Sequence, residues 1–389
     1  MSDLHLHIIA FDIPYPPTYG GVIDLFYQIK ALSEAGVRVH LHAFEYGKGK
    51  RSKELENLCF QVNYYSRKTG LISSIGLKPY ITVSRRSAFL MKELIKDNYP
   101  ILFEGLHTCY YINDKRLANR IKLVRTTNIE HRYYASLAAA ERNIFKKIYY
   151  SVASLKLWYY QEVIIYADII LPVSDTDATY FQKIFPSTKV HTLPCFHANN
   201  RITNERGGGN YVLFHGNLEV AENERAAVYL MKNVMNDIDY PFIIAGNSPS
   251  KRLLRIAANY PNVTIMASPD EKTMTELIRN AHINLLITFQ ATGLKLKLLN
   301  ALYNGSFVVV NNKMLHGTGL DDLCFIANTA LEMKEKVRFL IKSAYHSTEE
   351  KRNITVLTEK YDNTKNVEKL IALIKKEISE QADQDLETV

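Results

Sequence analysis

A glycine and two lysines stand between a predicted buried strand and a predicted buried helix. The stretch TFQATGLKLKLLNALYNGSFVVVNN covers residues 288–312 and contains Gly293, Lys295 and Lys297. Apolar runs on both sides predict strands, and the leucines between them predict a helix that Gly305 ends, as a residue tolerant of positive φ would. The start of a helix that follows a parallel strand attracts anions through its free backbone N–H groups. The lysines therefore indicate either a phosphate site or a solvated turn, and this stretch alone does not decide between them.

Glycines also follow three other predicted strands. Gly20 and Gly21 stand between the first strand and the first helix of the chain. Gly216, with Asn217, follows the first strand of the second half, and Gly246 follows the strand PFIIA. Backbone without a Cβ can come close to a diphosphate, so we expect these residues in a donor-binding site. A plain tight turn explains Gly20 and Gly21 equally well, because they form no GxGxxG pattern.

Two strands of the first half end in residues that could act on a hydroxyl group. Glu104 and His107 lie in ILFEGLHTCYY, and Glu130 and His131 follow the strand KLVRTTN. Side chains at the carboxyl ends of parallel strands face a shared crevice, which makes Glu104, His107 and Glu130 catalytic candidates. His107 could bind a sugar hydroxyl or deprotonate an acceptor. The alternative is an ordinary loop histidine, with Glu130 and His131 capping and solvating a helix.

Asp175 and Asp177 imitate an Asp-x-Asp metal motif in VSDTDATYF. Ser174 precedes a predicted helix, and acidic residues in a first helical turn are favoured by N-capping and by the helix dipole. We therefore interpret the pair as a helix start and expect no metal site.

Alternating strands and helices predict two α/β halves. Short apolar runs such as LHLHIIAFD, ADIILPVS and INLLIT alternate with helical patterns through most of the chain. Around residue 200 the sequence becomes polar and contains three consecutive glycines, which is typical of a linker. We expect two Rossmann-like, doubly wound parallel-sheet domains facing a cleft. The expected boundaries are 1–198 for the first domain, 199–210 for the linker, 211–365 for the second domain and 366–389 for a C-terminal helix with a frayed end.

The composition is that of a soluble globular protein of two domains. The chain has 389 residues, of which 47% are hydrophobic and 23% charged. Its four cysteines form no CxxC pair, which argues against a zinc site or a disulfide framework and for a reducing compartment. No signal peptide is evident, and no run of about 18 apolar residues occurs. We therefore expect a cytoplasmic protein.

The net charge of +8 is unevenly distributed. Residues 1–201 contain 26 Lys and Arg against 17 Asp and Glu, whereas the remainder contains 22 against 23. Such a basic half suggests an anionic partner, but no nucleic-acid motif is recognisable, and we expect no nucleic acid. Basic and aromatic residues share the stretch ERNIFKKIYYSVASLKLWYY, which suits contact with the inner face of a membrane. A helix with a normal solvated face is the alternative.

The opening stretch resembles the donor-site segment of family 4 glycosyltransferases of GT-B architecture. The family form is approximately G-x-K/R-x-K-x-x-E-A-x-x-x-G-x-P-V-V, in which Phe307 replaces the proline here. Pro17 with Gly20 and Gly21, and the segments TNIEHRYY, ADIILPVS and FHGNLEVAEN, extend the resemblance over nearly the full chain. The residues that match the segment itself are Gly293, Lys295, Lys297, Ala301, Gly305, Val308 and Val309.

Two positions depart from the family in a way that bears on catalysis. Asn300 stands at a glutamate that the family associates with the donor ribose, and Thr292 stands at a glutamate associated with the transferred sugar. An amide forms hydrogen bonds to hydroxyls but carries no charge to stabilise a cationic sugar centre. Thr127 replaces a histidine that relatives often carry, and GNLEVAEN lacks their diphosphate-binding arginine and lysine.

The resemblance implies a glycosyltransferase. A nucleotide diphosphate sugar would be the co-substrate, with no further cofactor, and a hydroxyl of a glycan or lipid-linked acceptor would receive the sugar, with retention of configuration. The first domain would hold the acceptor and the second the donor, at Gly20, Gly21, Gly216, Asn217, Gly246, Thr292, Gly293, Lys295, Lys297 and Asn300. The departures leave a second hypothesis open, a catalytically silent sugar-nucleotide or glycan-binding partner of another transferase. A GT-B epimerase fits less well, because its clustered acidic residues are not evident.

Overall fold

The chain folds into two α/β units. The computed structural model describes residues 4–45, 51–70, 76–141, 143–199, 209–290, 295–345 and 355–387, with side chains to Gln384. One unit consists of residues 1–198 together with 361–389, and the other consists of residues 199–360. None of the described helices has both the length and the apolar character needed to cross a membrane.

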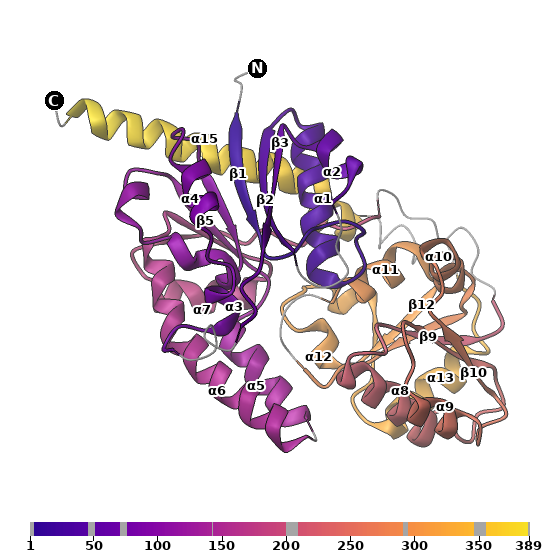
Figure 1. The fold of residues 1–389 in the computed structure, drawn as a ribbon. Coiled ribbons are helices and arrows are strands. Elements are labelled where there is room, and N and C mark those ends of the chain that lie inside the picture. The colour runs from indigo at the N-terminus through magenta and orange to yellow at the C-terminus, as the bar shows by residue number, and fades with distance from the viewer. Residues whose placement is uncertain are drawn as a thin grey trace. The chain divides into compact units, whose positions relative to one another are not determined.

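The first unit is built on a seven-stranded parallel sheet (Figure 1). The order β3-β2-β1-β4-β5-β6-β7 places β1 in the middle, with the chain continuing first to one side and then to the other. Its strands are β1 (His5–Ala10), β2 (Arg38–Glu45), β3 (Gln61–Ser66), β4 (Ile101–Glu104), β5 (Lys122–Thr126), β6 (Ile169–Pro172) and β7 (Lys189–Val190). Its helices are α1 (Gly20–Glu34), α2 (Lys53–Leu58), α3 (Tyr80–Val83), α4 (Ala88–Leu94), α5 (Glu130–Ala140), α6 (Ile144–Tyr160), α7 (Asp175–Ile184) and α15 (Asn363–Glu387), with short 3-10 turns η2 (Leu106–Tyr111), η3 (Lys115–Leu117) and η4 (Gln161–Tyr166).

The second unit repeats this topology with six parallel strands. The order β10-β9-β8-β11-β12-β13 again places the first strand in the middle. The strands are β8 (Val212–His215), β9 (Phe242–Gly246), β10 (Val263–Ala267), β11 (Ile283–Leu286), β12 (Phe307–Val310) and β13 (Phe325–Ile326). The helices are α8 (Ala221–Asn233), α9 (Lys251–Ala257), α10 (Glu271–Asn280), α11 (Leu296–Asn304), α12 (Asn312–Leu315), a helix over 355–360 and α13 (Ala330–Leu340), with one 3-10 turn η5 (Asp321–Leu323). The predicted pair of Rossmann-like, doubly wound parallel sheets is confirmed.

Side-chain caps begin many of the helices, and the exceptions are informative. Ser174 accepts a hydrogen bond from the backbone N–H of Asp177, so this segment forms the helix start that its sequence indicates. Ser52, Ser87, Asn143, Ser250, Asp270 and Thr329 cap other helices in the same way. By contrast, α1 and α11 begin after Tyr19 and Lys295 without a side-chain cap and without an acidic residue in the first turn. Their first N–H groups thus lack the usual partners.

The helix expected after the two lysines is present as α11, and its burial agrees with its apolar composition. Leu298, Leu299 and Leu302 are fully buried. Gly305 follows the helix as predicted, and its φ of −99° shows that it does not use the positive φ that glycine tolerates. Glycine is needed there for space instead. A Cβ on Gly305 would lie 2.3 Å from Nδ2 of Asn284 and 2.8 Å from the carbonyl oxygen of Ala301.

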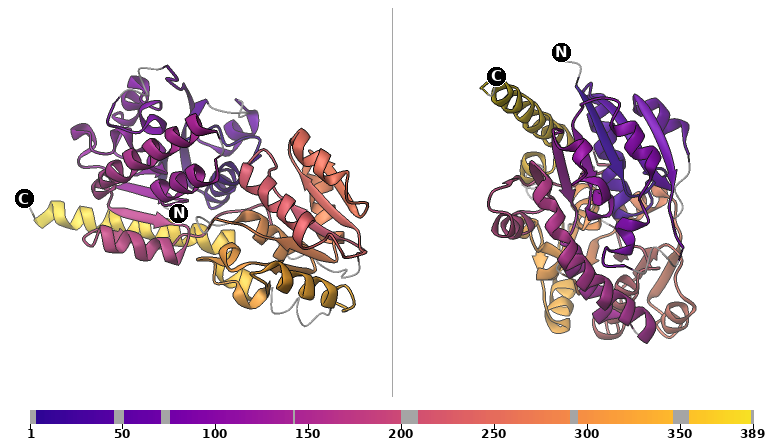
Figure 2. Two further views of the ribbon diagram at one scale, coloured as in Figure 1. Left: turned by 90° about the horizontal axis from the view of Figure 1, so that it is seen from below. Right: turned by 60° about the vertical axis from the view of Figure 1, so that its left-hand side comes forward.

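The C-terminal helix belongs to the first unit, which differs from the predicted boundaries at 365 and 366. In α15, Val367, Leu370 and Ile374 form one apolar face and are buried in the same core as Leu25 and Ile29 of α1. Lys189 forms ion pairs with Glu377 and Glu380 at 2.5 Å each. The helix continues to Glu387, so most of the end expected to fray is helical (Figures 1 and 2).

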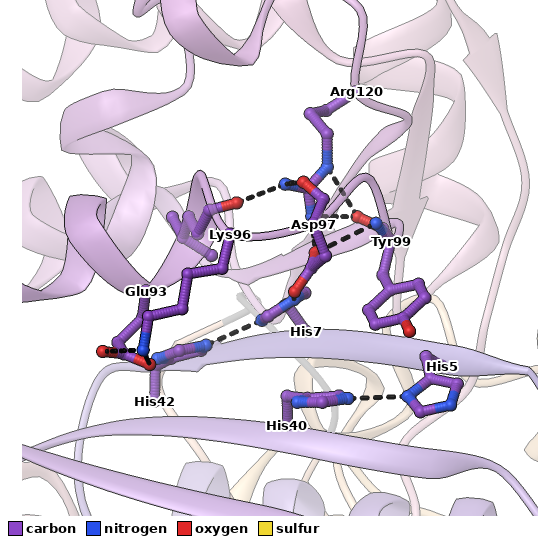
Figure 3. A network of polar contacts seen from close by, with 10 residues as sticks. His5, His7, His40, His42, Glu93, Lys96, Asp97, Tyr99 and Arg120 are labelled. Atoms are coloured by element: carbon purple, nitrogen blue, oxygen red, sulfur yellow. Dashed lines mark hydrogen bonds and ion pairs between the residues drawn. The ribbon is translucent and has the colours of Figure 1, made fainter.

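Four histidines line one face of the first sheet (Figure 3). His5 and His40 are joined through Nδ1 and Nε2 at 2.8 Å, and His7 and His42 are joined in the same way at 2.8 Å. The ring of His7 also contacts Asp97, with Nε2 3.0 Å from Oδ1. Burial lowers the pKa of His7 to about 4, and burial also lowers the pKa of His42 well below 6.5. The folded protein therefore favours the neutral rings of His7 and His42.

We expect this histidine cluster to make stability sensitive to acid. A histidine whose pKa is lowered by folding stabilises the protein above its unfolded pKa of about 6.5, and that contribution is lost as the pH falls toward the folded value. Replacing His42 by Gln should lower stability at pH 7.5, but it should reduce the further loss between pH 6.5 and 4.5. Chemical denaturation across this range measures both effects. The exposed His316 provides the control, since His316→Gln should retain the wild-type pH dependence. If the free energy of unfolding changes equally with pH in wild type and in His42→Gln, then His42 is not a source of the acid sensitivity.

Candidate functional site

In the second unit, the predicted donor residues gather where the strand order reverses. Strands β9 and β11 lie on opposite sides of β8. In sheets of this order, ligands generally bind in a crevice at the carboxyl ends of the strands where the order reverses, and we call this place in the second unit the donor crevice. Gly216 and Asn217 follow β8, and Lys295 and Lys297 lie beyond β11 at the start of α11. Thr292 and Gly293 lie outside the described residues.

Lys297 is one of the two lysines at this crevice. Its Nζ donates a hydrogen bond to Oδ1 of Asn223 at 3.0 Å and lies 5.2 Å from the ring centre of Phe214. Asn223 in turn donates from Nδ2 to the backbone oxygen of Asn217 at 2.9 Å. Since a backbone oxygen can only accept, this bond fixes the amide of Asn223 with its oxygen toward the lysine. One side chain thus connects the segment after β8 to the start of α11.

Burial is the main influence on the protonation of Lys297. Burial lowers its pKa to about 8, Glu222 opposes this shift, and Lys295 adds to it. Glu222 accepts hydrogen bonds from the hydroxyl of Thr288 and from the backbone N–H of Phe289. Burial and the charge of Lys297 also lower the pKa of His215 to about 3, so its ring is neutral. An anion bound beside Lys297 would raise its pKa and favour the positively charged form.

The two glycines of this site have different roles. A Cβ on Gly246 would lie 1.8 Å from the backbone oxygen of Gly216, so Gly246 is required for the close packing of two strand ends. A Cβ on Gly216 would lie 3.3 Å from the side chain of Asn223, the residue that accepts from Lys297. The backbone of Gly216 is therefore close to the polar groups of the crevice. The side-chain oxygen of Asn217 accepts from the N–H of Glu219 and helps to hold this turn. Gly246 is therefore a structural residue in the described unit.

Asn300 lies on the same helix as Lys297 and is held by other amides. Its Oδ1 accepts a hydrogen bond from Nδ2 of Asn199 at 2.9 Å. Asn304 donates to the backbone oxygen of Asn300 at 3.0 Å. The position at which the resemblance expects a ribose contact thus belongs to an asparagine network.

In the first unit, Gly20 and Gly21 form the first turn of α1. A Cβ on Gly20 would meet nothing within 4 Å, and one on Gly21 would lie 3.0 Å from the ring of Phe11. This open, uncapped helix start lies after β1, next to the segment that follows β4. The geometry fits an approach of ligand to backbone, and whether these glycines bind the donor stays a prediction.

Glu104 is buried in an ionic cluster. Its Oε2 lies 3.9 Å from a guanidinium nitrogen of Arg125, and the same guanidinium is paired with Asp24. Burial raises the pKa of Glu104 to about 7, the charge of Arg125 opposes this rise, and the charge of Asp24 adds to it. Only 1% of the Glu104 surface is exposed. These contacts assign it a place in the core of the first unit.

His107 and Glu130 lie closer to solvent, beside cationic side chains. Burial lowers the pKa of His107 well below 6.5, and the charges of Arg85 and Arg67 lower it further. Burial raises the pKa of Glu130 to about 8, against the opposing charge of Arg85. At neutral pH His107 is therefore neutral and Glu130 is mostly protonated, so that each can form hydrogen bonds with a hydroxyl.

A small pocket opens beside Glu130 at the carboxyl ends of β4 and β5, and we call it the β5 pocket. Two polar atoms near it, Oγ1 of Thr126 and Nδ1 of His131, are buried and make no hydrogen bond within the described residues. Buried polar atoms without partners are costly, which suits a site that binds a polar ligand. The pocket is lined by Gly105, Leu106, Thr126, Asn128, Glu130, His131, Leu157, Gln161, Ile164 and Phe181.

Comparison with solved structures identifies the architecture. A glycosyltransferase from Rickettsia africae superposes with a TM-score of 0.66 at 13% identity, covering 97% of this chain and 99% of that one. The catalytic domain of starch synthase IV from Arabidopsis thaliana, bound to ADP and acarbose, gives a TM-score of 0.66 at 12% identity. This match covers 97% of this chain and 100% of that one. Sucrose-phosphate synthase from Thermosynechococcus elongatus gives a TM-score of 0.63 at 13% identity, and the match covers 99% of this chain and 100% of that one.

The chain has the GT-B glycosyltransferase fold.

Sequence comparison adds a relative of similar length. A 44.6 kDa protein of the cps region of Klebsiella pneumoniae is 27% identical over 331 residues, which cover 80% of this chain and 84% of the relative. No family model matches the sequence. The resemblance to GT-B enzymes is therefore confirmed for the fold, and the chemistry has to be argued from the residues.

Three residues that contact the predicted donor residues of the second unit were not singled out by the sequence analysis. Asn223, Glu222 and Asn199 have no motif of their own, and each reaches its partner across a long stretch of chain. Asn223 lies 74 residues from Lys297, and Asn199 lies 101 residues from Asn300. The sequence offered a weak signal for Glu222 alone. This acidic residue lies in the first turn of α8 beside the glycine turn, where an anion site would favour a neutral residue.

We expect Lys297 to bind the diphosphate of a nucleotide. Lys297→Ala should weaken binding of a nucleoside diphosphate by about 10- to 100-fold, because a charged hydrogen bond contributes roughly 1.5–3 kcal/mol, and it should leave the bare nucleoside unaffected. Wild-type affinity should also fall as the pH rises from 7 to 9.5, since Lys297 loses its proton near pH 8. Calorimetric titration of both ligands over this range measures these effects.

The control for this experiment is Lys251→Ala, which removes an exposed lysine of the same unit. It should retain wild-type affinity and pH dependence. If Lys297→Ala weakens nucleoside and nucleoside diphosphate equally, then the contact is not with the phosphates.

Proposed function

We propose that the protein transfers a sugar from a nucleotide diphosphate donor to a hydroxyl of a glycan or lipid-linked acceptor. The observation that carries this proposal is the donor crevice of the second unit, where Lys297, the uncapped start of α11 and the turn at Gly216 converge. Cationic side chains and free helix N–H groups are the groups that stabilise a leaving diphosphate. The starch synthase of the same fold is described as bound to ADP, which supports a nucleotide ligand.

The first unit would receive the acceptor in the β5 pocket. Thr126, Asn128, Glu130 and His131 offer hydrogen-bonding groups there, with apolar side chains on the remaining walls. The relative from the cps region, a region of capsule genes, favours a cell-surface glycan as the acceptor. A cleft in which donor and acceptor would meet stays a prediction.

The reaction would proceed with retention, because the residues suit a mechanism without a protein base. The bond between the anomeric carbon and the β-phosphate oxygen breaks, and the acceptor oxygen bonds to that carbon from the same side. The acceptor proton passes to the leaving phosphate, whose negative charge Lys297 stabilises. Glu130, with its pKa raised to about 8, would orient the acceptor hydroxyl in its protonated form.

A donor screen tests the proposal directly. The protein should bind one nucleotide sugar and release its nucleoside diphosphate, slowly without an acceptor and faster with one, and Lys297→Ala should abolish the release. Glu130→Gln should keep transfer within about threefold of wild type, since the amide replaces a protonated acid and not a base. A loss above about 100-fold would instead make Glu130 the base. If no nucleotide sugar binds or reacts, a silent glycan-binding role replaces the enzyme.

A membrane surface is the partner that α6 favours. The inner side of this helix is anchored, since Tyr160 donates to the backbone oxygen of Cys109 and Ser154 donates to that of His131. Its outer side exposes apolar and aromatic side chains to solvent. The exposed residues are Ile144, Phe145, Ile148, Tyr149, Val152, Leu155, Trp158 and Tyr159.

The chemistry of this face fits an anionic lipid interface. Lys146 and Lys147 are exposed on α6, and Arg132 is exposed on α5, which lies beside α6 (Figure 1). Aromatic rings among basic residues are typical of helices that lie in the headgroup region. Because Leu157 of α6 also lines the β5 pocket, a membrane on the outer face would bring a lipid-linked acceptor close to that pocket.

We expect binding to anionic vesicles that added salt weakens. The double variant Phe145→Ser with Ile148→Ser should lower partitioning into phosphatidylglycerol-containing vesicles at least about tenfold, because each apolar side chain contributes roughly 1 kcal/mol or more. Cosedimentation with these vesicles and with pure phosphatidylcholine vesicles measures the effect. Leu331→Ser with Phe339→Ser removes two equally exposed apolar side chains of α13 and should change nothing. Binding that ignores lipid charge would leave a soluble acceptor.

A further inference from the structure

The β5 pocket has room for only a small part of an acceptor. Its apolar walls are at most 3% exposed and are formed by Leu106, Leu157, Ile164 and Phe181. These residues belong to η2, α6, η4 and α7, so four elements close the pocket around the end of β5. The space that they leave accommodates about one group the size of a water molecule. A sugar ring does not fit into this space, whereas a single substituent of a ring does.

The polar atoms of the pocket are complementary to a hydroxyl group. Oγ1 of Thr126 and Nδ1 of His131 are buried and have no hydrogen-bond partner within the described residues. Thr126 is 3% exposed, and Glu130, which also lines the pocket, is 8% exposed and mostly protonated. A threonine hydroxyl and a protonated carboxyl group can each donate and accept a hydrogen bond, as a ligand hydroxyl also can. A hydroxyl in the pocket therefore satisfies polar atoms that are costly to leave without partners.

The lining disfavours charged substituents and purely apolar ones. Among the described residues that line the pocket, none is a lysine or an arginine. A carboxylate or a phosphate would thus be buried without a counter-charge, beside the carboxyl group of Glu130. A methyl group would fit, but it would leave Thr126 and His131 without partners. A hydroxyl attached directly to a sugar ring would press the ring against the apolar walls, whereas a hydroxymethyl group stands one carbon farther out.

We propose that the β5 pocket binds the hydroxymethyl group of a neutral hexose in the acceptor, with the primary hydroxyl at Thr126 and the methylene group against the apolar walls. The inference rests on the proposed function, because it takes this pocket as the acceptor site. The enclosed hydroxyl anchors the hexose, and another hydroxyl at the mouth of the pocket receives the sugar. Glu130 has two oxygens, so one can hold the anchored hydroxyl while the other orients the receiving one. Thr126 then selects hexoses over 6-deoxyhexoses and uronic acids.

The first test compares acceptors that differ only at carbon 6. The methyl glycosides of D-glucose, D-galactose and D-mannose are offered to the unmodified protein with the nucleotide sugar that it binds, beside the 6-deoxy form and the uronic acid of each. The measurement is kcat/KM for transfer. We expect the best hexoside to exceed both of its analogues at least about 30-fold, because a site that bonds a buried hydroxyl strongly rejects a ligand without one. Equal use of this hexoside and its 6-deoxy form would overturn the inference.

A variant of nearly unchanged shape tests the role of Thr126. Thr126→Val should reduce the preference for the hexoside over its 6-deoxy form about three- to tenfold. It should also keep or raise the melting temperature of the ligand-free protein, because it removes a buried polar atom that has no partner within the described residues. If the pocket holds only a structural water, Thr126→Val lowers the melting temperature and leaves the preference unchanged, and the inference fails. Thr176→Val, at an exposed position of α7, is the control and should change neither.

The outcomes separate this inference from the proposed function. If the protein transfers sugar but uses none of the hexosides, or uses the 6-deoxy forms equally well, the pocket has another occupant while the proposed function stands. If no nucleotide sugar reacts, the proposed function fails, and saturation-transfer NMR of the same glycosides decides about the pocket. Binding that prefers a hexoside and loses this preference in Thr126→Val then supports the hexose site in a silent binding protein. Equal binding of the analogues, or none, overturns it.

Discussion

The constraint on which both units depend is the order of their strands. In each sheet the first strand is central and the chain moves outward on one side before returning to the other, so that two consecutive loop systems diverge above the same edge. The loops that follow two neighbouring central strands lead to opposite sides at this point, so they separate at the carboxyl edge of the sheet. Every polar residue that we connect with chemistry, from Gly20 and Glu130 to Gly216 and Lys297, lies at this carboxyl edge. The sheets therefore explain why the candidate sites are where they are before any side chain is considered.

Within that frame, buried charge decides which acidic residue remains available in the first unit. Arg125 is fully buried and pairs with Asp24, while a second bond reaches the backbone oxygen of Pro194. Removing one partner of such a pair leaves an uncompensated charge and costs about 3–5 kcal/mol. Glu104 lies in the field of this pair and is withdrawn from solvent with it. Glu130 is then the carboxyl group of the β5 pocket, held mostly neutral by its own burial.

In the second unit, neutral amide side chains form the hydrogen bonds that hold Lys297 and Asn300. Asn223 accepts a hydrogen bond from Lys297, and Asn199 with Asn304 holds Asn300. In each chain of hydrogen bonds a backbone oxygen fixes the direction of the amides. Lys297, with its pKa lowered to about 8, still carries its charge at neutral pH, and an anion bound beside it would favour that charged form further.

The sequence by itself determined most of the helices and strands and the sheet edge at which the candidate residues lie. The central strands β1, β4, β8 and β11 are apolar runs that are buried on both faces, so composition alone predicts them. The edge strands β3, β7 and β13 were not predicted, because they are half-polar or only two residues long. The helix after the lysines, its burial and the cap at Ser174 are likewise local, and the sequence was sufficient for each.

Only the tertiary structure decided which polar side chains meet. Lys297 and Asn223 are separated by 74 residues, and the asparagines at 199 and 300 by 101, so no local spacing can encode their contacts. The same holds for Arg125 and Asp24, also 101 residues apart, whose pairing assigns Glu104 to the core. Helices and strands follow from interactions between near neighbours in the chain, whereas hydrogen-bond partners and pKa values follow from the packing of distant segments. The sequence therefore predicted the strand ends at which the candidate residues lie, and the packing decided the protonation and direction of their groups.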